Sequence, residues 1–94
     1  MNFETFQESL NAVAPPASAN VYLQSLWYDA KDNWEKAHTL IQDISDKKAA
    51  WIHAYLHRKE GDVWNANYWY TKADQRMPGY TFEQEWEEIV KAMV

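Results

Sequence analysis

Two histidines within one predicted helix have the type and spacing that could do chemistry. His53 and His57 are four residues apart, so a helix places both imidazoles on one face, which is the spacing of a helical metal-binding pair. A zinc site needs three or four ligands, and the His-Glu-x-x-His form is absent because Ala54 follows His53. One hypothesis is therefore a metal or small-molecule site completed from the following turn, made of His53, His57, Glu60 and Asp62.

The other hypothesis for the two histidines is structural. On a helix from Lys47 to Glu60, both fall inside an apolar arc formed by Ala49, Ala50, Ala54 and Leu56. We expect them to point inward as hydrogen-bonded core residues, because a neutral, partnered histidine is readily buried. His38 has no such companion nearby in the sequence.

No catalytic motif accompanies these residues. The serines Ser9, Ser25 and Ser45 lack the surroundings of an activated nucleophile, and the chain has no cysteine. A run of acidic residues near the end is typical of a solvated helix face; its members are Glu83, Glu85, Glu87 and Glu88. We therefore expect a non-catalytic protein, and no cofactor is assigned from the sequence.

Length and charge narrow the class of protein further. The 94 residues fit one domain, and the net charge of −5 without any basic cluster argues against nucleic-acid binding. There is no signal-peptide pattern and no apolar run of about 18 residues, so we expect no membrane contact. With no cysteine, the expected location is the cytoplasm.

The elements that carry these residues are predicted to be six helices in antiparallel hairpins, an all-α fold. Only two Gly and three Pro punctuate the chain. Apolar spacing predicts a first helix within residues 1–14, ended by Pro15 and Pro16. Ser18 and Asp32 are expected to cap the next two helices, within residues 19–45.

The second half of the chain has clearer helix boundaries. Gly61 supplies a left-handed residue after one helix, and Asp62 caps the next. Pro78 and Gly79 end that helix, and Thr81 and Gln84 form a capping box for a last amphipathic helix at 81–94.

Residues 47–78 resemble a tetratricopeptide repeat, a helix-turn-helix unit of about 34 residues. The matching positions are the turn, the small residues at which paired helices approach, and the closing proline: Ala54, Gly61, Asp62, Ala66, Tyr70, Ala73 and Pro78. Residues 19–45 resemble a degenerate copy, so residues 81–94 would be a capping helix. The stretch from Trp51 to Tyr70 is also similar to small uncharacterised bacterial proteins, which implies no activity.

The resemblance implies a module that binds a protein or peptide on a concave face. The positions that match the groove of such repeats are Tyr22, Trp51, Tyr55, Arg58 and Lys59. Arg58 and Lys59 could hold a carboxylate while Trp51 and Tyr55 contact an apolar side chain. The alternative is a solvated rim beside core aromatic residues.

Two further aromatic residues lie outside the predicted core stripes. Trp64 and Tyr68 are four residues apart, on the helix face opposite Ala66 and Tyr70. Either the first or the last helix covers them, or they form a surface for a partner or for homodimer formation.

Overall fold

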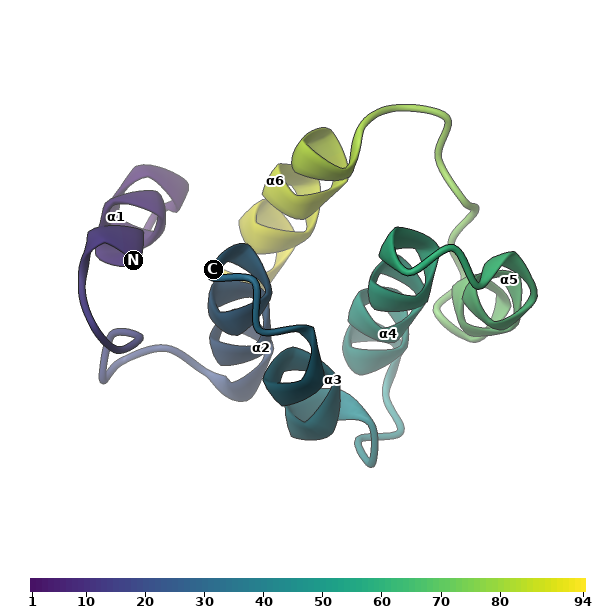
Figure 1. Cartoon of the computed structure of the whole chain (residues 1–94), viewed down its shortest axis with the longest axis horizontal. Coiled ribbons are helices and arrows are strands. Elements are labelled where there is room, and N and C mark those ends of the chain that lie inside the picture. The colour runs from purple at the N-terminus through teal and green to yellow at the C-terminus, as the bar shows by residue number, and fades with distance from the viewer.

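The computed structural model describes residues 1–94 and contains helices without any strand (Figure 1). The elements are α1 (Phe3–Glu8), a 3-10 turn η1 (Ser9–Asn11), α2 (Val21–Ala30), α3 (Trp34–Ile41), α4 (Lys47–Lys59), α5 (Val63–Lys72) and α6 (Phe82–Met93). The prediction of an all-α fold with six helices is confirmed.

The predicted helix caps are correct for α5 and α6 and wrong for α2 and α3. Asp62 caps α5, and Thr81 forms the expected capping box with Gln84. The cap of α2 is Asn20 rather than Ser18, since the Asn20 side chain accepts from the amide of Leu23.

The cap of α3 is Asn33 rather than Asp32. The Asn33 side chain accepts from the amide of Lys36. Asp32 lies in the left-handed region at φ 62°, in the turn that leaves α2, so it ends one helix instead of beginning the next.

Two helix hairpins position the candidate residues. In the first, α2 packs on α3, and Ser25 donates to the carbonyl of the fully buried Ala37 at 2.8 Å. In the second, α4 packs on α5 around the fully buried Ala66, and Gly61 turns the chain at φ 83°. The tetratricopeptide resemblance stays a prediction.

The last helix returns to the first half of the chain. Helix α6 packs against α4, α2 and α1, across the inner side of the arc of helices in Figure 1. The Trp86 indole contacts Phe3 and Phe6 and donates to the carbonyl of Leu26 at 3.0 Å. Because of this path, α6 belongs to the main core and leaves the outer face of α5 uncovered.

No helix combines the length and the apolar character that crossing a lipid bilayer would require.

Candidate functional site: a three-histidine cluster

Three imidazoles from two helices meet where α3 packs on α4. Helix α3 contributes His38, and α4 contributes His53 and His57. The Nε2 atoms of His38 and His53 are 2.9 Å apart, and one ligand atom from each of the three residues lies within 4.8 Å of the others. The hairpins therefore join the predicted pair to a third histidine.

The orientation expected for the predicted pair is confirmed. His53 is 6% exposed and His57 is 9% exposed, while His38 is partly exposed at the edge of the cluster. Each of the buried rings has a hydrogen-bond partner, since His53 contacts His38 and His57 Nδ1 contacts the carboxylate of Glu60. The cluster is packed and partnered, and His38 is the most exposed of its three imidazoles.

Burial keeps two of the imidazoles neutral. Desolvation lowers the pKa of His53 to about 3, and nearby positive charge on His38 or His57 adds to the effect. Burial, followed by the charge of His57, also lowers the pKa of His38. At neutral pH these two rings are uncharged, and an uncharged imidazole has the nitrogen lone pair that binds a metal.

Two tryptophans enclose the cluster. Trp34 stacks on His38 with ring centroids 4.9 Å apart, and Trp69 stacks on His53 at 3.9 Å. The Trp34 indole donates to the carbonyl of Leu56 at 2.8 Å, which fixes α3 on α4. Such an apolar shell restricts water and holds the rings in place.

The spacing of the rings suits a shared metal ion. Their centroids are 4.6 Å (His38 and His53), 4.9 Å (His53 and His57) and 5.4 Å (His38 and His57) apart. Three imidazoles on one tetrahedral ion, each with a metal–nitrogen distance of about 2.0–2.1 Å, have centroids about 5 Å apart. The observed centroid spacing is therefore close to that of three imidazoles on one ion.

The two acidic residues predicted for this site have separate roles. Glu60 contacts His57, as a partner that orients a ligand would. Asp62 lies close to both but uses its carboxylate to cap α5, where it accepts from Asn65. The hydrogen bonds from Asn65 lower the pKa of Asp62. The third histidine, His38, is the residue that the sequence prediction missed.

The five groove candidates are engaged within the molecule. Tyr55, one of these candidates, is 2% exposed and donates to Asp29 at 2.9 Å. Burial, with the charge of Asp29, raises the pKa of Tyr55. Lys59 pairs with the same carboxylate at 2.9 Å, and Tyr22 donates to Asp46.

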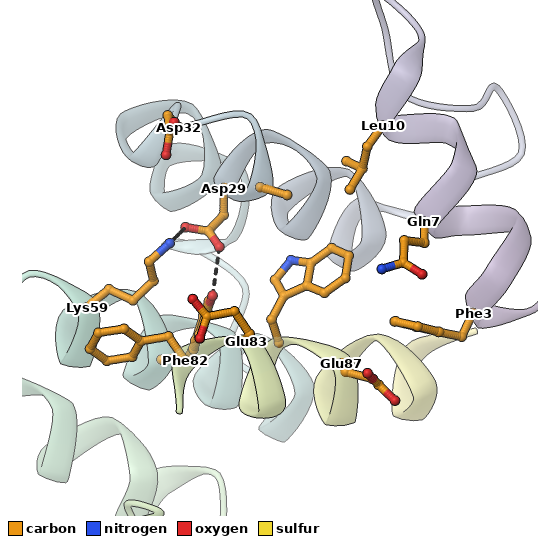
Figure 2. Close-up of a pocket in the computed structure, with 12 residues that line it drawn as sticks. Phe3, Gln7, Leu10, Asp29, Asp32, Lys59, Phe82, Glu83 and Glu87 are labelled. Atoms are coloured by element: carbon orange, nitrogen blue, oxygen red, sulfur yellow. Dashed lines mark hydrogen bonds and ion pairs between the residues drawn. The ribbon is translucent and has the colours of Figure 1, made fainter. Parts of the chain in front are cut away.

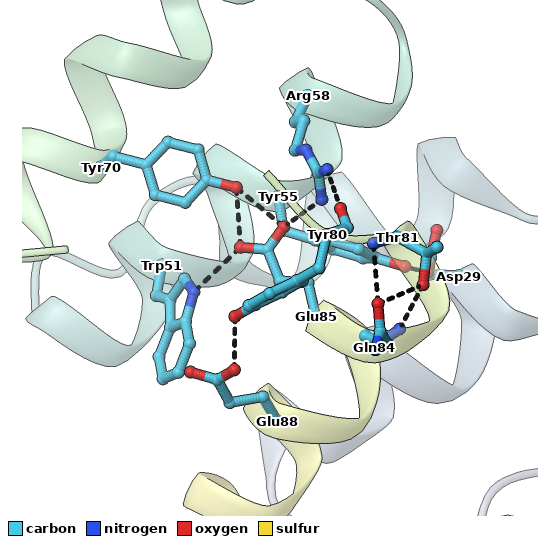
Figure 3. Close-up of polar contacts among 10 residues, drawn as sticks. All are labelled: Asp29, Trp51, Tyr55, Arg58, Tyr70, Tyr80, Thr81, Gln84, Glu85 and Glu88. Carbon is cyan, nitrogen blue, oxygen red and sulfur yellow. Dashed lines mark hydrogen bonds and ion pairs between the residues drawn. The ribbon is translucent and has the colours of Figure 1, made fainter. Parts of the chain in front are cut away.

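Trp51 and Arg58 converge on Glu85 of α6 (Figure 3). The Arg58 guanidinium lies 2.9 Å from Glu85, and the Tyr70 hydroxyl donates to the same carboxylate at 2.7 Å. Glu85 is 1% exposed, so the prediction that it belongs to a solvated acidic face is wrong. Arg58 was expected to hold a carboxylate of a bound peptide. It binds instead the carboxylate of Glu85, which belongs to the protein's own last helix.

The predicted self-association residues are exposed. Trp64 is 76% exposed and Tyr68 is 46% exposed, and their rings are nearly parallel with centroids 6.2 Å apart. Neither the first nor the last helix covers them. Tyr68 also contacts Trp69, whose ring stacks on His53.

The fold and the site together describe an all-helical protein with a histidine cluster between two hairpins. Comparisons of the chain with models of protein families, with curated proteins and with solved structures give no match.

Proposed function

We propose that this protein binds a divalent transition-metal ion through His38, His53 and His57. The observation that carries the proposal is the convergence of three imidazoles from two helices, with ligand atoms within 4.8 Å of one another. Imidazole nitrogen is a preferred ligand of zinc, copper and nickel.

The surroundings of the cluster support a metal ligand set. The Glu60 carboxylate accepts from His57 Nδ1, so the free lone pair of that ring is on Nε2. Carboxylates orient metal-bound histidines in the same way. His38 and His53 are neutral, so neither has to lose a charge before it binds an ion.

Three protein ligands leave one position of a tetrahedral ion free. Structural zinc sites are closed by four protein ligands, whereas a water molecule or an outside ligand fills the fourth position of three-ligand sites. The partly exposed edge at His38 gives access to that position. We therefore propose an open metal site rather than a purely structural one.

Calorimetric titration of the untagged, metal-free protein with Zn²⁺ tests this function. We expect one ion per chain in the wild type. The variant His38→Gln keeps a hydrogen-bonding group beside His53 but lacks the imidazole, and its affinity should fall by about a hundredfold or more. Gln42→Ala is the matched control, because Gln42 lies four residues after His38 at the end of α3. This variant should bind zinc as the wild type does. Equal zinc binding by His38→Gln and the wild type would refute the proposal.

A second candidate function is protein binding through the outer face of α5. The observation that favours it is the exposure of Trp64 beside Tyr68, since tryptophan and tyrosine dominate interface energetics. A second copy of the chain is the first partner to test. Sedimentation velocity should show a concentration-dependent dimer that Trp64→Ser abolishes, and a wild-type monomer at high concentration would exclude self-association.

A further inference from the structure

A cavity of about 350 Å³ opens on the other side of α4 from the histidines (Figure 2). It is bounded by α1, by the end of α2, by the C-terminal half of α4 and by α6. This volume lies within the range of small-molecule sites. The cavity shares no residue with the three-histidine cluster.

Aromatic rings form much of the cavity wall. Phe3 and Trp86 meet edge to face with centroids 5.9 Å apart, and Phe82 and Tyr55 line the opposite end. Figure 2 shows Phe3 and Phe82 at the two ends of the cavity. Ring faces of this kind attract cations and apolar groups alike.

Carboxylates outnumber cations around the same cavity. Asp29 is paired with Lys59, and Glu87 is paired with Lys91 at 2.6 Å. Asp32 and Glu83 also line the cavity, and neither forms an ion pair. These two carboxylates at its walls have no ion-pair partner within 4.0 Å, and the nearby Lys31 ammonium donates to the carbonyl of Leu10 at 2.8 Å.

Two of the lining rings, Tyr55 and Phe3, each already carry an ammonium group of the protein that is paired with a lining carboxylate. Lys59 Nζ lies 5.6 Å from the Tyr55 ring centroid while it pairs with Asp29. Lys91 Nζ lies 5.3 Å from the Phe3 ring centroid while it pairs with Glu87. A carboxylate together with an aromatic face is a recurrent way of recognising ammonium ligands.

We propose that this cavity binds a small organic cation, a ligand with an ammonium group on a short apolar body. Its charge lies near Asp32 and Glu83, the two carboxylates without an ion pair. Its apolar part lies on Trp86 and Leu10. The proposal is independent of metal binding, because it uses a different face of α4.

Choline and its neutral isostere 3,3-dimethylbutan-1-ol separate this proposal from simple apolar binding. Each is titrated into the full-length protein while the Trp86 indole N–H signal is followed by NMR. Choline should shift the signal and saturate, and the neutral alcohol should bind about tenfold more weakly or not at all. Equal binding of the two, or no shift of the signal with choline at tens of millimolar, would overturn the proposal.

Charge-removing variants locate the site. Glu83 and Asp32 are exposed, so Glu83→Gln and Asp32→Asn should leave the fold intact, which circular dichroism checks. Each should weaken choline binding by about threefold to tenfold. Glu35→Gln removes the same charge from α3, away from the cavity, and should leave the affinity unchanged. Wild-type affinity in both cavity variants would contradict the assignment of this cavity.

Discussion

The Nε2 atoms of His38 and His53 lie 2.9 Å apart across the contact between α3 and α4. At this distance one ring donates its Nε2 proton and the other accepts it, so the two Nε2 atoms cannot both carry a proton without breaking the contact. A metal ion that replaces this proton would bind both rings. Protonation of this pair and metal binding to it should therefore both change the free energy of unfolding.

Acid should destabilise the metal-free protein through His53. Its pKa of about 3 in the folded state lies below the ordinary value of 6.5, so between these pH values the unfolded chain binds more protons than the folded one. The free energy of unfolding should therefore fall by about 2–3 kcal/mol between pH 7 and pH 4, and this contribution is fully present only above pH 6.5.

Urea unfolding at a series of pH values, with a chelator present, measures this loss. Carboxylates also titrate near pH 4, so the comparison is with His53→Gln, which has no proton to gain. The variant should be less stable at pH 7 and should lose less stability on acidification. An identical pH dependence in the two proteins would show that His53 does not titrate in this way.

Zinc should stabilise the folded protein by mass action. If the folded state alone binds the ion, a free zinc concentration of 100 times Kd raises the free energy of unfolding by about 2.7 kcal/mol. Thermal unfolding followed by Trp fluorescence should show this rise in the wild type and in Gln42→Ala. A similar rise in His38→Gln would place the bound zinc elsewhere.

Glu85 should be the most sensitive carboxylate for stability. It is buried and accepts from Trp51, Arg58 and Tyr70. Glu85→Gln leaves the Arg58 charge without its counterion, so the free energy of unfolding should fall by about 3 kcal/mol. Glu87→Gln removes an exposed pair with Lys91 and should cost less than about 1 kcal/mol. Denaturant titration measures both, and equal losses would contradict the buried network.

Removing the strain at Asp32 should stabilise the protein. The residue has a φ of 62°, which glycine adopts without steric cost. Asp32→Gly should raise the free energy of unfolding by up to about 1 kcal/mol, whereas Asn33→Ala should lower it by about 1 kcal/mol because α3 loses its cap. Chemical denaturation measures both free energies of unfolding. If Asp32 were the cap, Asp32→Gly would lower the free energy of unfolding and Asn33→Ala would not.

The exposed ring of Trp64 should contribute little to the monomer. It is 76% exposed, so Trp64→Ser should change the free energy of unfolding by less than about 0.5 kcal/mol at low protein concentration. Trp69→Ala removes the ring stacked on His53 and should cost several times more. A large loss of stability for Trp64→Ser that depends on protein concentration would indicate that the ring is buried between copies of the chain.

The sequence predicts local features of this fold better than its long-range contacts. The capping box at Thr81 and the turn at Gly61 depend on neighbouring residues, and both are predicted correctly. Asp32 and Asn33 are adjacent and chemically similar, so the sequence alone does not distinguish the cap from the residue before it.

In the candidate site, too, the local features are predictable from the sequence and the long-range contacts are not. The pairing of His53 with His57 follows from helical spacing, whereas His38 joins them only because α3 packs on α4. The burial of Tyr55 and Glu85 depends on the return of α6 across α4, which no local pattern indicates. Trp34, one turn before His38 on the same helix, is the signal that could have drawn attention to that face.

The most direct test of metal binding is X-ray absorption at the zinc edge of the untagged protein loaded with one equivalent of Zn²⁺. Three bound imidazoles give nitrogen scatterers at about 2.0 Å together with the outer-shell pattern of the imidazole ring. We predict three such ligands and one exchangeable oxygen ligand. A spectrum with fewer than three imidazoles, or with oxygen ligands only, would contradict binding at His38, His53 and His57.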